Sequence, residues 1–386
     1  MINLALFFTL GNGLDTWDRF GILEREVALY RKLADHGVKT TFVTYGGREE
    51  TRYKRDLEGI DICCNRFGLP EILYQYALPL LHVQALRRCN LFKTNQTHGS
   101  QVALRAGILH RKPVVARSGY MWSDFTERQY GKESREARRS IGIENRVFSR
   151  AEKIVVTTPM MAQEIHKRIA LAERKIRIIP NYVDTERFRP NYDKCRSGHI
   201  VYIGRLEKQK NVGALLEAVE NTGITITIVG TGEEQRYLEN KFGNLHGRLK
   251  WTGNLPHLEL PDVIHQAQVF VLPSLYEGHP KTLLEAMACG VAVLGTNRPG
   301  IRELIRHNKN GYLCEPDAPS IRNAINELVA KPEACRRLGK AGRRDVEENY
   351  SLDQVVKKEI RMFSEILVAK EQSPRSSGRK RDIEFK

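Results

Sequence analysis

The feature that most constrains the fold of this chain is a regular alternation of short apolar runs with amphipathic segments, and this alternation occurs twice. In the first half the apolar runs begin at Leu4–Phe8 and end at Ile176–Ile179. In the second half they begin at His199–Ile203 and end at Gly311–Cys314. Because strands that alternate with helices form parallel sheets covered on both faces, we expect two doubly wound α/β domains.

The boundary between the two rounds lies at Ile179–Asp184, a proline-containing connector. We therefore place an N-terminal Rossmann-like domain at 1–186 and a C-terminal one at 187–350. Residues 351–370 are predicted to form a last helix that returns to the N-terminal domain. The tail 371–386 is expected to be disordered, because it contains almost nothing to bury.

The cysteines and the apolar runs exclude several classes of protein. The seven cysteines include no C-x-x-C pair, which argues against a disulfide framework or a zinc ribbon and favours a reducing cytoplasm. The apolar run 72–86 contains Pro79 and His82 and is shorter than the roughly 20 residues of a membrane span. The apolar start 1–8 has no basic region before it, so it is predicted to be a buried strand and not a signal peptide.

The charge of the chain implies an anionic partner. The 386 residues include 62 Lys+Arg and 46 Asp+Glu, for a net charge of +16. Such a balance suits nucleic acid, phosphorylated small molecules or acidic lipid. Residues 1–190 carry 32 basic and 21 acidic residues, or +11, so the remainder carries +5.

One basic segment, 128–153, has the apolar spacing of an amphipathic helix. We consider two roles for it: contact with anionic lipid, or a solvated face with intrahelical pairs such as those of Glu144 with nearby arginines. The arginines that would line the polar face are Arg135, Arg138, Arg139 and Arg146.

The segment from Leu272 to Gly290 is the most informative for function. It predicts a buried strand, a polar loop and then a helix, with Pro280 in the first turn of the helix. Gly278 lets the backbone approach a ligand closely. The free N–H groups around Lys281–Leu283 form an anion site at a helix N-terminus. Ligands bind at such strand ends in open α/β sheets.

Two carboxylates flank this anion site, Glu277 in the loop and Glu285 inside the helix. Carboxylates repel phosphate, so their natural partners are the hydroxyl groups of a sugar. The same spacing also fits an ordinary strand–loop–helix unit with a solvated Glu277 and a surface Glu285.

Two further turns follow strands in the same half. In Gly204–Asn211, Arg205 and Lys210 are placed to reach a diphosphate, although a solvated basic turn also fits. Gly230 and Gly232 form a Gly-x-Gly turn that lacks the third glycine of a dinucleotide fingerprint. A plain tight turn explains that pattern as well as ligand contact does.

Together these segments resemble the retaining glycosyltransferases of the GT-B fold, in the family 4 (glycosyl transferases group 1) type that uses nucleotide sugars. The resemblance covers about residues 154 to 366, and it rests on the E-x7-E pair, the Gly-Arg-Leu stretch, Val-Gly-Thr-Gly, the linker and the last helix. It implies two Rossmann-like domains that face each other across a cleft.

The resemblance also implies a role for each matched residue. Arg205 and Lys210 would neutralise the donor diphosphate, Glu285 would hold the ribose hydroxyls, and Glu277 would contact the transferred sugar. The base would lie near Asn254. The donor-binding set implied beside Glu285 is Gly13, Gly230, Gly232, Asn254, Leu255, Gly278, His279, Pro280, Lys281, Thr282 and Leu283.

The N-terminal half departs from the family pattern. Many members carry a histidine near the end of an N-domain strand, where this chain has Arg117 and Ser118. His98, in the only His-Gly pair of the first half, is therefore carried as a site residue, although a structural histidine also explains it. The loop Gly11–Gly13 is expected to face the cleft, and a plain turn is the alternative.

The expected function is transfer of a sugar from a nucleotide-sugar donor to a glycan or lipid-linked acceptor in cell-surface glycan synthesis. No metal or other cofactor is expected, since Arg205 and Lys210 supply positive charge. The protein would be cytoplasmic, with an anionic membrane surface as a possible contact and no nucleic-acid partner. The alternatives are a sugar-nucleotide epimerase of the same fold and, in another class, a basic nucleic-acid-binding protein.

Overall fold

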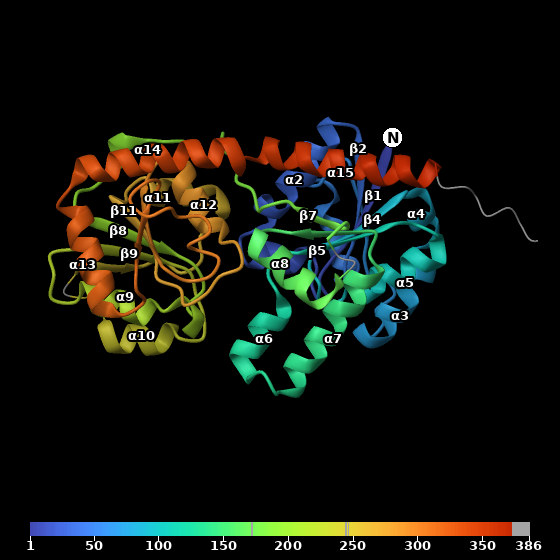
Figure 1. The fold of residues 1–386 in the computed structure, drawn as a ribbon, viewed down its shortest axis with the longest axis horizontal. Helices are drawn as coiled ribbons and strands as arrows, with labels where there is room; N and C mark the ends of the chain where they lie inside the picture. The colour runs from blue at the N-terminus through green and yellow to red at the C-terminus, as the bar shows by residue number, and fades with distance from the viewer. Residues whose placement is uncertain (171–172, 244, 246, 373–386) are drawn as a thin grey trace, which may run out of the picture.

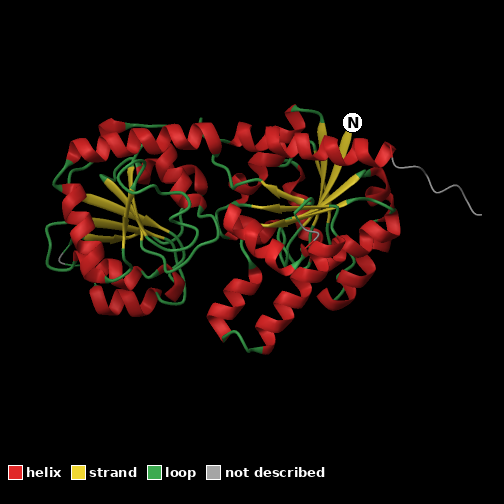
Figure 2. Cartoon of the chain, viewed as in Figure 1, coloured by secondary structure: helices red, strands yellow, loops and turns green. Residues whose placement is uncertain are grey.

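The computed structural model describes residues 1–386 except 171–172, 244, 246 and 373–386, and it shows two parallel sheets with helices on both faces (Figures 1 and 2). The first sheet has the order β3-β2-β1-β4-β5-β6-β7 and the second β10-β9-β8-β11-β12-β13. The strands of the first sheet are β1 Ile2–Phe7, β2 Val38–Val43, β3 Ile60–Cys63, β4 Leu91–Thr94, β5 Val114–Ser118, β6 Lys153–Val156 and β7 Ile176–Ile178. Those of the second are β8 His199–Ile203, β9 Thr225–Val229, β10 Leu249–Trp251, β11 Val269–Leu272, β12 Ala292–Thr296 and β13 Tyr312–Cys314.

The strands form because their apolar runs can be buried on both faces of the sheet. Every residue of β4, β8, β11 and β12 is buried, which is the pattern expected of central parallel strands. The predicted doubly wound architecture is confirmed, and strand ends differ from the expected positions by one or two residues.

The helices alternate with the strands along the chain. Those of the first half are α1 Leu14–Arg19, α2 Leu23–Asp35, α3 Glu71–Leu81, α4 Val83–Arg88, α5 Ser100–His110, α6 Trp122–Tyr130, α7 Arg135–Arg150 and α8 Pro159–Arg168. Those of the second half are α9 Val212–Val219, α10 Gln235–Phe242, α11 Leu260–Ile264, α12 Lys281–Ala288, α13 Ala318–Val329 and α14 Pro332–Asn349. Within the described part of the chain, no helix is both long and apolar enough to cross a bilayer.

The region after β1 contains two helices, α1 and α2, separated by a break at Gly21. Gly21 has φ +67°, and a Cβ atom at this position would lie 3.0 Å from the carbonyl oxygen of Leu255 in the other half. Since only glycine adopts this conformation freely, the chain turns here and approaches the second half closely.

The last helix, α15 (Leu352–Gln372), runs back along the N-terminal half (Figure 1). Its side chains Val355, Met362, Phe363 and Ile366 belong to the same apolar cluster as β1 and α2. Residues 371 and 372, expected to be disordered, end this helix, and the rest of the expected tail lies outside the described residues.

The chain passes between the two halves twice, and the two crossings are hydrogen-bonded to each other. The N–H of Val183 donates to the carbonyl of Tyr350 at 3.0 Å, and the N–H of Leu352 donates to the carbonyl of Val183 at 2.9 Å. The linker and the returning helix are therefore joined at the point where they cross.

A buried ion pair fixes α15 on the first sheet. The ammonium of Lys93, on β4, contacts the carboxylate of Glu359, and both side chains are almost completely buried. Burial lowers the pKa of Lys93, and the charge of Glu359 opposes this effect. The pair therefore joins strand and helix across 266 residues of sequence.

We predict that Lys93→Met lowers the free energy of unfolding by about 3–5 kcal/mol, because it leaves a buried carboxylate without its cation. The double variant Lys93→Met/Glu359→Leu should recover most of this loss, because it leaves no buried charge at the site. Urea unfolding followed by circular dichroism measures both. A Lys93→Met variant whose free energy of unfolding lies within about 1 kcal/mol of the wild-type value would contradict burial of the pair.

Candidate active site

The carboxyl ends of β8 and β11 lie side by side where the strand order of the second sheet reverses. The chain connections that leave these two strands run to opposite faces of the sheet. The crevice between them is the usual ligand position in open α/β sheets. β8 leads into the turn 204–211, and β11 leads into the loop 273–280 before α12. The fold thus brings together the two main predicted donor segments.

Lys210 and Glu277, which come from these separate segments, form an ion pair. The Nζ atom of Lys210 lies 2.5 Å from Oε1 of Glu277, and the hydroxyl of Ser274 donates to the same oxygen at 2.7 Å. The two charged side chains are only 13% and 8% exposed. The side-chain amide of Gln209 donates to the carbonyl of Tyr276 at 2.8 Å and so ties the turn to the loop. A solvated Glu277 is excluded.

Arg205 is more open than Lys210. Its side chain is 61% exposed, and its guanidinium lies 2.6 Å from the carboxylate of Glu207. Burial raises the pKa of Tyr120, in the N-terminal half, and the positive charge of Arg205 opposes that rise. An anion from solvent can reach this exposed guanidinium.

The start of α12 leaves backbone donors free at this site. The helix begins at Lys281, and no side chain caps it. Pro280 occupies the N-cap position and not the first turn, one residue from the predicted place. Thr282 is half-buried and Leu283 is fully buried, so Leu283 can offer a ligand only its backbone. The first N–H groups of a helix have no intrahelical acceptor, which suits an anion.

The loop before α12 packs closely on the N-terminal half. A Cβ atom at Gly278 would lie 2.7 Å from the carbonyl oxygen of Gly119, so only glycine allows this approach. The ring of Tyr276 lies 5.1 Å from the ring of Phe125 and 4.8 Å from the guanidinium of Arg128, both on α6. The segment that carries Glu277 is therefore also a contact between the domains.

Glu285 is buried at the second turn of α12, with 1% exposure, so a surface position is excluded. Its Oε1 lies 2.9 Å from Nε2 of His257 and 3.7 Å from the guanidinium of Arg25 on α2. Burial raises the pKa of Glu285, but the hydrogen bond from His257 and the charge of Arg25 outweigh it and hold the pKa below the usual value. Its Oε2 and Nδ1 of His257 have no partner among the described residues.

The side chain of Lys281 is engaged with the N-terminal half. Its ammonium lies 2.6 Å from Glu26 on α2 and 5.3 Å from the ring centre of Tyr182. Burial lowers the pKa of Lys281 to about 8, although Glu26 opposes this shift. Against the effect of burial, Lys281 and Arg25 hold the pKa of Glu26 at about 2. A donor would therefore meet the backbone of residue 281 and not a free ammonium.

His279 is buried at the same seam. Its ring lies 5.5 Å from the ring of Tyr350, and its carbonyl accepts a 2.7 Å hydrogen bond from Asn181. Burial, together with the charges of Arg117 and Lys281, lowers the pKa of His279 to about 3. The imidazole is therefore neutral at physiological pH.

The glycines of the β9 turn are required by packing. A Cβ atom at Gly230 or Gly232 would lie 2.0 or 2.3 Å from carbonyl oxygens of the neighbouring turn 204–206. The two turns therefore support each other, and ligand contact by these glycines stays a prediction. Asn254 and Leu255 follow β10, at the same carboxyl edge of the sheet.

In the N-terminal half, Gly13 is buried against a carboxylate of the chain itself. The carboxylate of Glu50 accepts hydrogen bonds from the N–H of Leu14 and from the hydroxyl of Thr44. A Cβ atom at Gly13 would overlap Glu50. Burial raises the pKa of Glu50. The start of α1, expected to face a donor, is thus occupied by a side chain from the same domain.

His98 follows β4, and its half-buried ring lies 4.9 Å from the ring of Trp122. Burial lowers its pKa. The two residues that occupy the usual histidine position at the end of β5, Arg117 and Ser118, are engaged by other groups. Arg117 donates to the side-chain oxygen of Asn181 in the linker at 2.6 Å, and Ser118 is fully buried. Of these three residues, His98 and Arg117 are half-buried and only Ser118 is fully buried.

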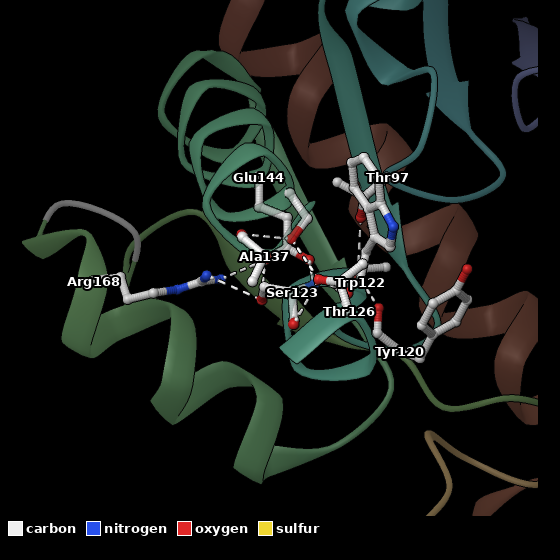
Figure 3. Close-up of polar contacts among 10 residues, drawn as sticks. Thr97, Tyr120, Trp122, Ser123, Thr126, Ala137, Glu144 and Arg168 are labelled. Carbon is white, nitrogen blue, oxygen red and sulfur yellow. Dashed lines mark hydrogen bonds and ion pairs between the residues drawn. The ribbon is translucent and has the colours of Figure 1, made fainter. Parts of the chain in front are cut away.

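A buried carboxylate holds α6 and α7 to the domain (Figure 3). Glu144 accepts from the N–H and the hydroxyl of Ser123 at 3.1 and 2.6 Å, and from the guanidinium of Arg168 at 2.8 Å. The alternative in which Glu144 pairs with arginines of its own helix is therefore wrong. This cluster fixes the start of α6, which carries Phe125 to its contact with Tyr276.

Sequence reasoning missed several of these residues. Ser274 lies three positions before Glu277, and a hydroxyl so close to a conspicuous carboxylate was an available signal. Arg25 and Glu26 gave no signal, because their partners on α12 lie more than 250 residues away in the chain. His257 gave none either, because its partner Glu285 belongs to a separate element 28 residues away.

Two family models match consecutive parts of the chain. The model described as Glycosyltransferase Family 4 matches residues 27–187, and the one described as Glycosyl transferases group 1 matches residues 184–345. Together they include the first sheet except β1, the whole second sheet and every segment of the candidate site in the second half.

Curated relatives match part of their own length. A glycogen synthase of Mycobacterium tuberculosis is 28% identical over 55% of this chain and 54% of its own length. An Escherichia coli UDP-Gal:alpha-D-GlcNAc-diphosphoundecaprenol alpha-1,3-galactosyltransferase is 33% identical over 42% of this chain and 46% of its own length. The chain thus aligns with about half the length of these relatives.

Solved structures match the whole arrangement. The sucrose-phosphate synthase of Thermosynechococcus elongatus aligns with 96% of this chain and all of its own, at a TM-score of 0.76 and 19% identity. The Anabaena protein HepE, in complex with UDP-glucose, aligns with 96% of this chain and all of its own, at a TM-score of 0.74 and 17% identity. With two family models on its two domains and this shared architecture, the chain belongs to the group 1 glycosyltransferases and has the GT-B fold.

Proposed function

We propose that this protein transfers a sugar from a nucleoside diphosphate sugar to a hydroxyl group of a glycan or lipid-linked acceptor, with retention at the anomeric carbon. The observation that carries the proposal is the Lys210–Glu277 pair beside the uncapped start of α12, at the switch point of the second sheet. This arrangement offers positive charge and backbone donors to a diphosphate and a carboxylate to a sugar.

The charges at this site suit a leaving diphosphate. When the bond between the anomeric carbon and the phosphate oxygen breaks, the electron pair goes to that oxygen. Arg205, Lys210 and the first N–H groups of α12 would stabilise this charge, and preorganised stabilisation of this kind supplies much of the rate enhancement in many enzymes. Lys210, which pairs with Glu277 in the ligand-free structure, would then divide its contacts between the carboxylate and the donor phosphate.

The two glutamates would hold the two sugars of the donor. Glu277 would orient the transferred sugar and stabilise the positive charge that develops at its anomeric carbon. Glu285 has a buried oxygen without a partner among the described residues, and a buried acceptor of this kind gains from a hydroxyl donor such as a ribose. The acceptor oxygen would attack on the face from which the diphosphate leaves, and its proton would pass to the leaving phosphate oxygen.

The proposal does not require a metal ion, because cationic side chains and the helix start provide the charge. Among the residues that the structure describes, no group of three or more His, Cys, Asp or Glu side chains is arranged to hold one.

The printed names of the relatives guide the choice of substrates. HepE is described in complex with UDP-glucose, and the Escherichia coli relative is named for a diphosphoundecaprenol acceptor. We propose a nucleotide-sugar donor and a lipid-linked acceptor in cell-surface polysaccharide or glycolipid synthesis. The reaction would take place in the cytoplasm, at the inner face of the membrane.

We predict that Lys210→Ala lowers kcat/KM by about 10²–10³-fold, because the leaving diphosphate loses a preorganised cation. Glu277→Gln should lower kcat by a similar factor. Lys208→Ala is the matched control, since this exposed lysine lies on the same short turn and should leave the rate unchanged. Release of nucleoside diphosphate in the presence of acceptor measures the rate. Full activity of the Lys210→Ala variant would overturn the assignment.

We also predict that one nucleoside diphosphate raises the Tm of the protein by a few degrees at about 100 times its Kd, where binding contributes about 2.7 kcal/mol. A thermal-shift series with UDP, GDP and ADP identifies the base. Glu285→Gln should weaken this shift, because the amide accepts fewer hydrogen bonds from ribose. The control is Glu333→Gln, at an exposed carboxylate on α14 of the same domain. An equal shift in the Glu285→Gln variant would show that ribose binds elsewhere.

A further inference from the structure

Six large apolar side chains on the neighbouring helices α3 and α5 are exposed to solvent. Those of α3 share one face, because their positions in the helix fall within about one quadrant. Their exposed fractions lie between 50% and 72%. The six, which we call the α3–α5 patch, are Ile72, Leu73, Tyr76, Leu80, Ile108 and Leu109.

Polar contacts hold the two helices side by side, so the patch is continuous. The guanidinium of Arg105, on α5, donates to the carbonyl of Gln75 at 3.0 Å and lies 4.4 Å from the ring centre of Tyr76. The imidazole of His110 lies 2.9 Å from the carbonyl of Pro79. These contacts place the end of α5 beside the end of α3.

The segments around the patch are strongly basic. Residues 66–112 include seven Lys+Arg and one Asp+Glu, and one of the seven, Lys93, is the buried partner of Glu359. None of the other six forms an ion pair with a described residue. These six, which we call the basic rim, are Arg66, Arg87, Arg88, Arg105, Arg111 and Lys112.

Helix α7, for which the sequence alone suggests a lipid contact, lacks this combination. Its apolar residues Ala137, Val147 and Phe148 are buried in the domain, and Ile141 and Ile143 are half-buried, so α7 has no large exposed apolar side chain. One of those arginines, Arg138, is paired with Glu133 at 2.9 Å. The exposed apolar side chains of α3 and α5 are accompanied by basic residues on α4, on α5 and directly after α5, whereas the arginines of α7 have no large exposed apolar side chain on their own helix.

We propose that the α3–α5 patch and its basic rim dock this protein on an anionic phospholipid surface. The apolar side chains would enter the boundary between headgroups and acyl chains, and the rim would contact lipid phosphates. A second copy of the chain is a poorer occupant, because a symmetric contact would bring two basic rims together.

The position of the patch fits a lipid-borne acceptor, and this part of the inference rests on the proposed function. Glu71, at the first turn of α3, lies against Gly11 in the loop after β1, where a Cβ atom would be 2.9 Å from its Oε2. The patch starts at the next residue, Ile72. The docking face therefore begins at the carboxyl edge of the first sheet, where the cleft of the GT-B fold lies.

Co-sedimentation of the full chain with vesicles tests the proposal. We expect binding to phosphatidylcholine vesicles that contain phosphatidylglycerol, and weak binding to phosphatidylcholine alone. The variant Leu73→Gln/Leu80→Gln/Ile108→Gln should lower the partition coefficient at least about tenfold. Leu258→Gln, at an exposed residue of the C-terminal domain, is the matched apolar control and should bind as the wild type does.

A second pair of variants separates the two basic faces. Arg87→Glu/Arg88→Glu should lower binding to anionic vesicles at least about tenfold, whereas Arg138→Glu/Arg139→Glu, on α7, should change it far less. Equal losses in the two variants would overturn the assignment to α3 and α5. Wild-type vesicle binding by the triple glutamine variant would overturn it too.

Two readouts without membranes complete the design. The patch variants should keep the wild-type Tm and the wild-type rate with a detergent-free, short-chain acceptor, since the patch lies outside the donor site. Failure of transfer in the wild type would count against the proposed function and leave vesicle binding as an independent result. A concentration-dependent dimer that the triple variant abolishes, with vesicle binding unchanged, would identify a second copy as the occupant and overturn the proposal.

Discussion

Buried charges can persist in a protein only when they are paired, and in this structure the pairs join segments that are distant in the chain. Lys93 meets Glu359 where the last helix returns, and Glu26 and Lys281 meet where the two domains touch. Lys210 and Glu277 meet in the candidate active site. The position of the last helix, the domain seam and the site all depend on this single requirement.

The same requirement separates two kinds of positive charge. Lys93 and Lys281 are committed to internal carboxylates, and Lys210 pairs with Glu277 inside the candidate site, so none of the three contributes charge to the outer surface. The arginines of the basic rim have no such partners among the described residues. Net charge alone therefore says little about what this protein binds, whereas the location of these cations beside exposed apolar area is specific.

Much of the architecture could be predicted from the sequence. Buried parallel strands are largely apolar runs, so β8 was expected at its observed bounds, His199–Ile203. The donor segments could also be found, because Arg205, Lys210, Glu277 and Glu285 lie at strand–helix junctions, where local pattern and chemistry coincide. Local signals of this kind can be recognised without knowledge of the tertiary fold.

The rest could not be predicted, because it depends on contacts between distant segments. Nothing in the residues around Glu285 indicates that His257 and Arg25 bury it, or that Glu50 fills the space beside Gly13. The intrahelical pairing considered for Glu144 as one of two alternatives was wrong for the same reason, since spacing within one helix could not reveal Arg168. The exposed face of α3 gives no local signal either, because its apolar residues do not show which side the domain covers.

The contact of Tyr276 and Gly278 with α6 and its preceding loop couples the candidate active site to the arrangement of the domains. The loop that carries Glu277 packs on the N-terminal half in this structure, so a rotation of one domain relative to the other would act directly on this loop. A substitution at Phe125, more than 150 residues from Glu277 in the chain, would therefore reach the candidate site through this contact.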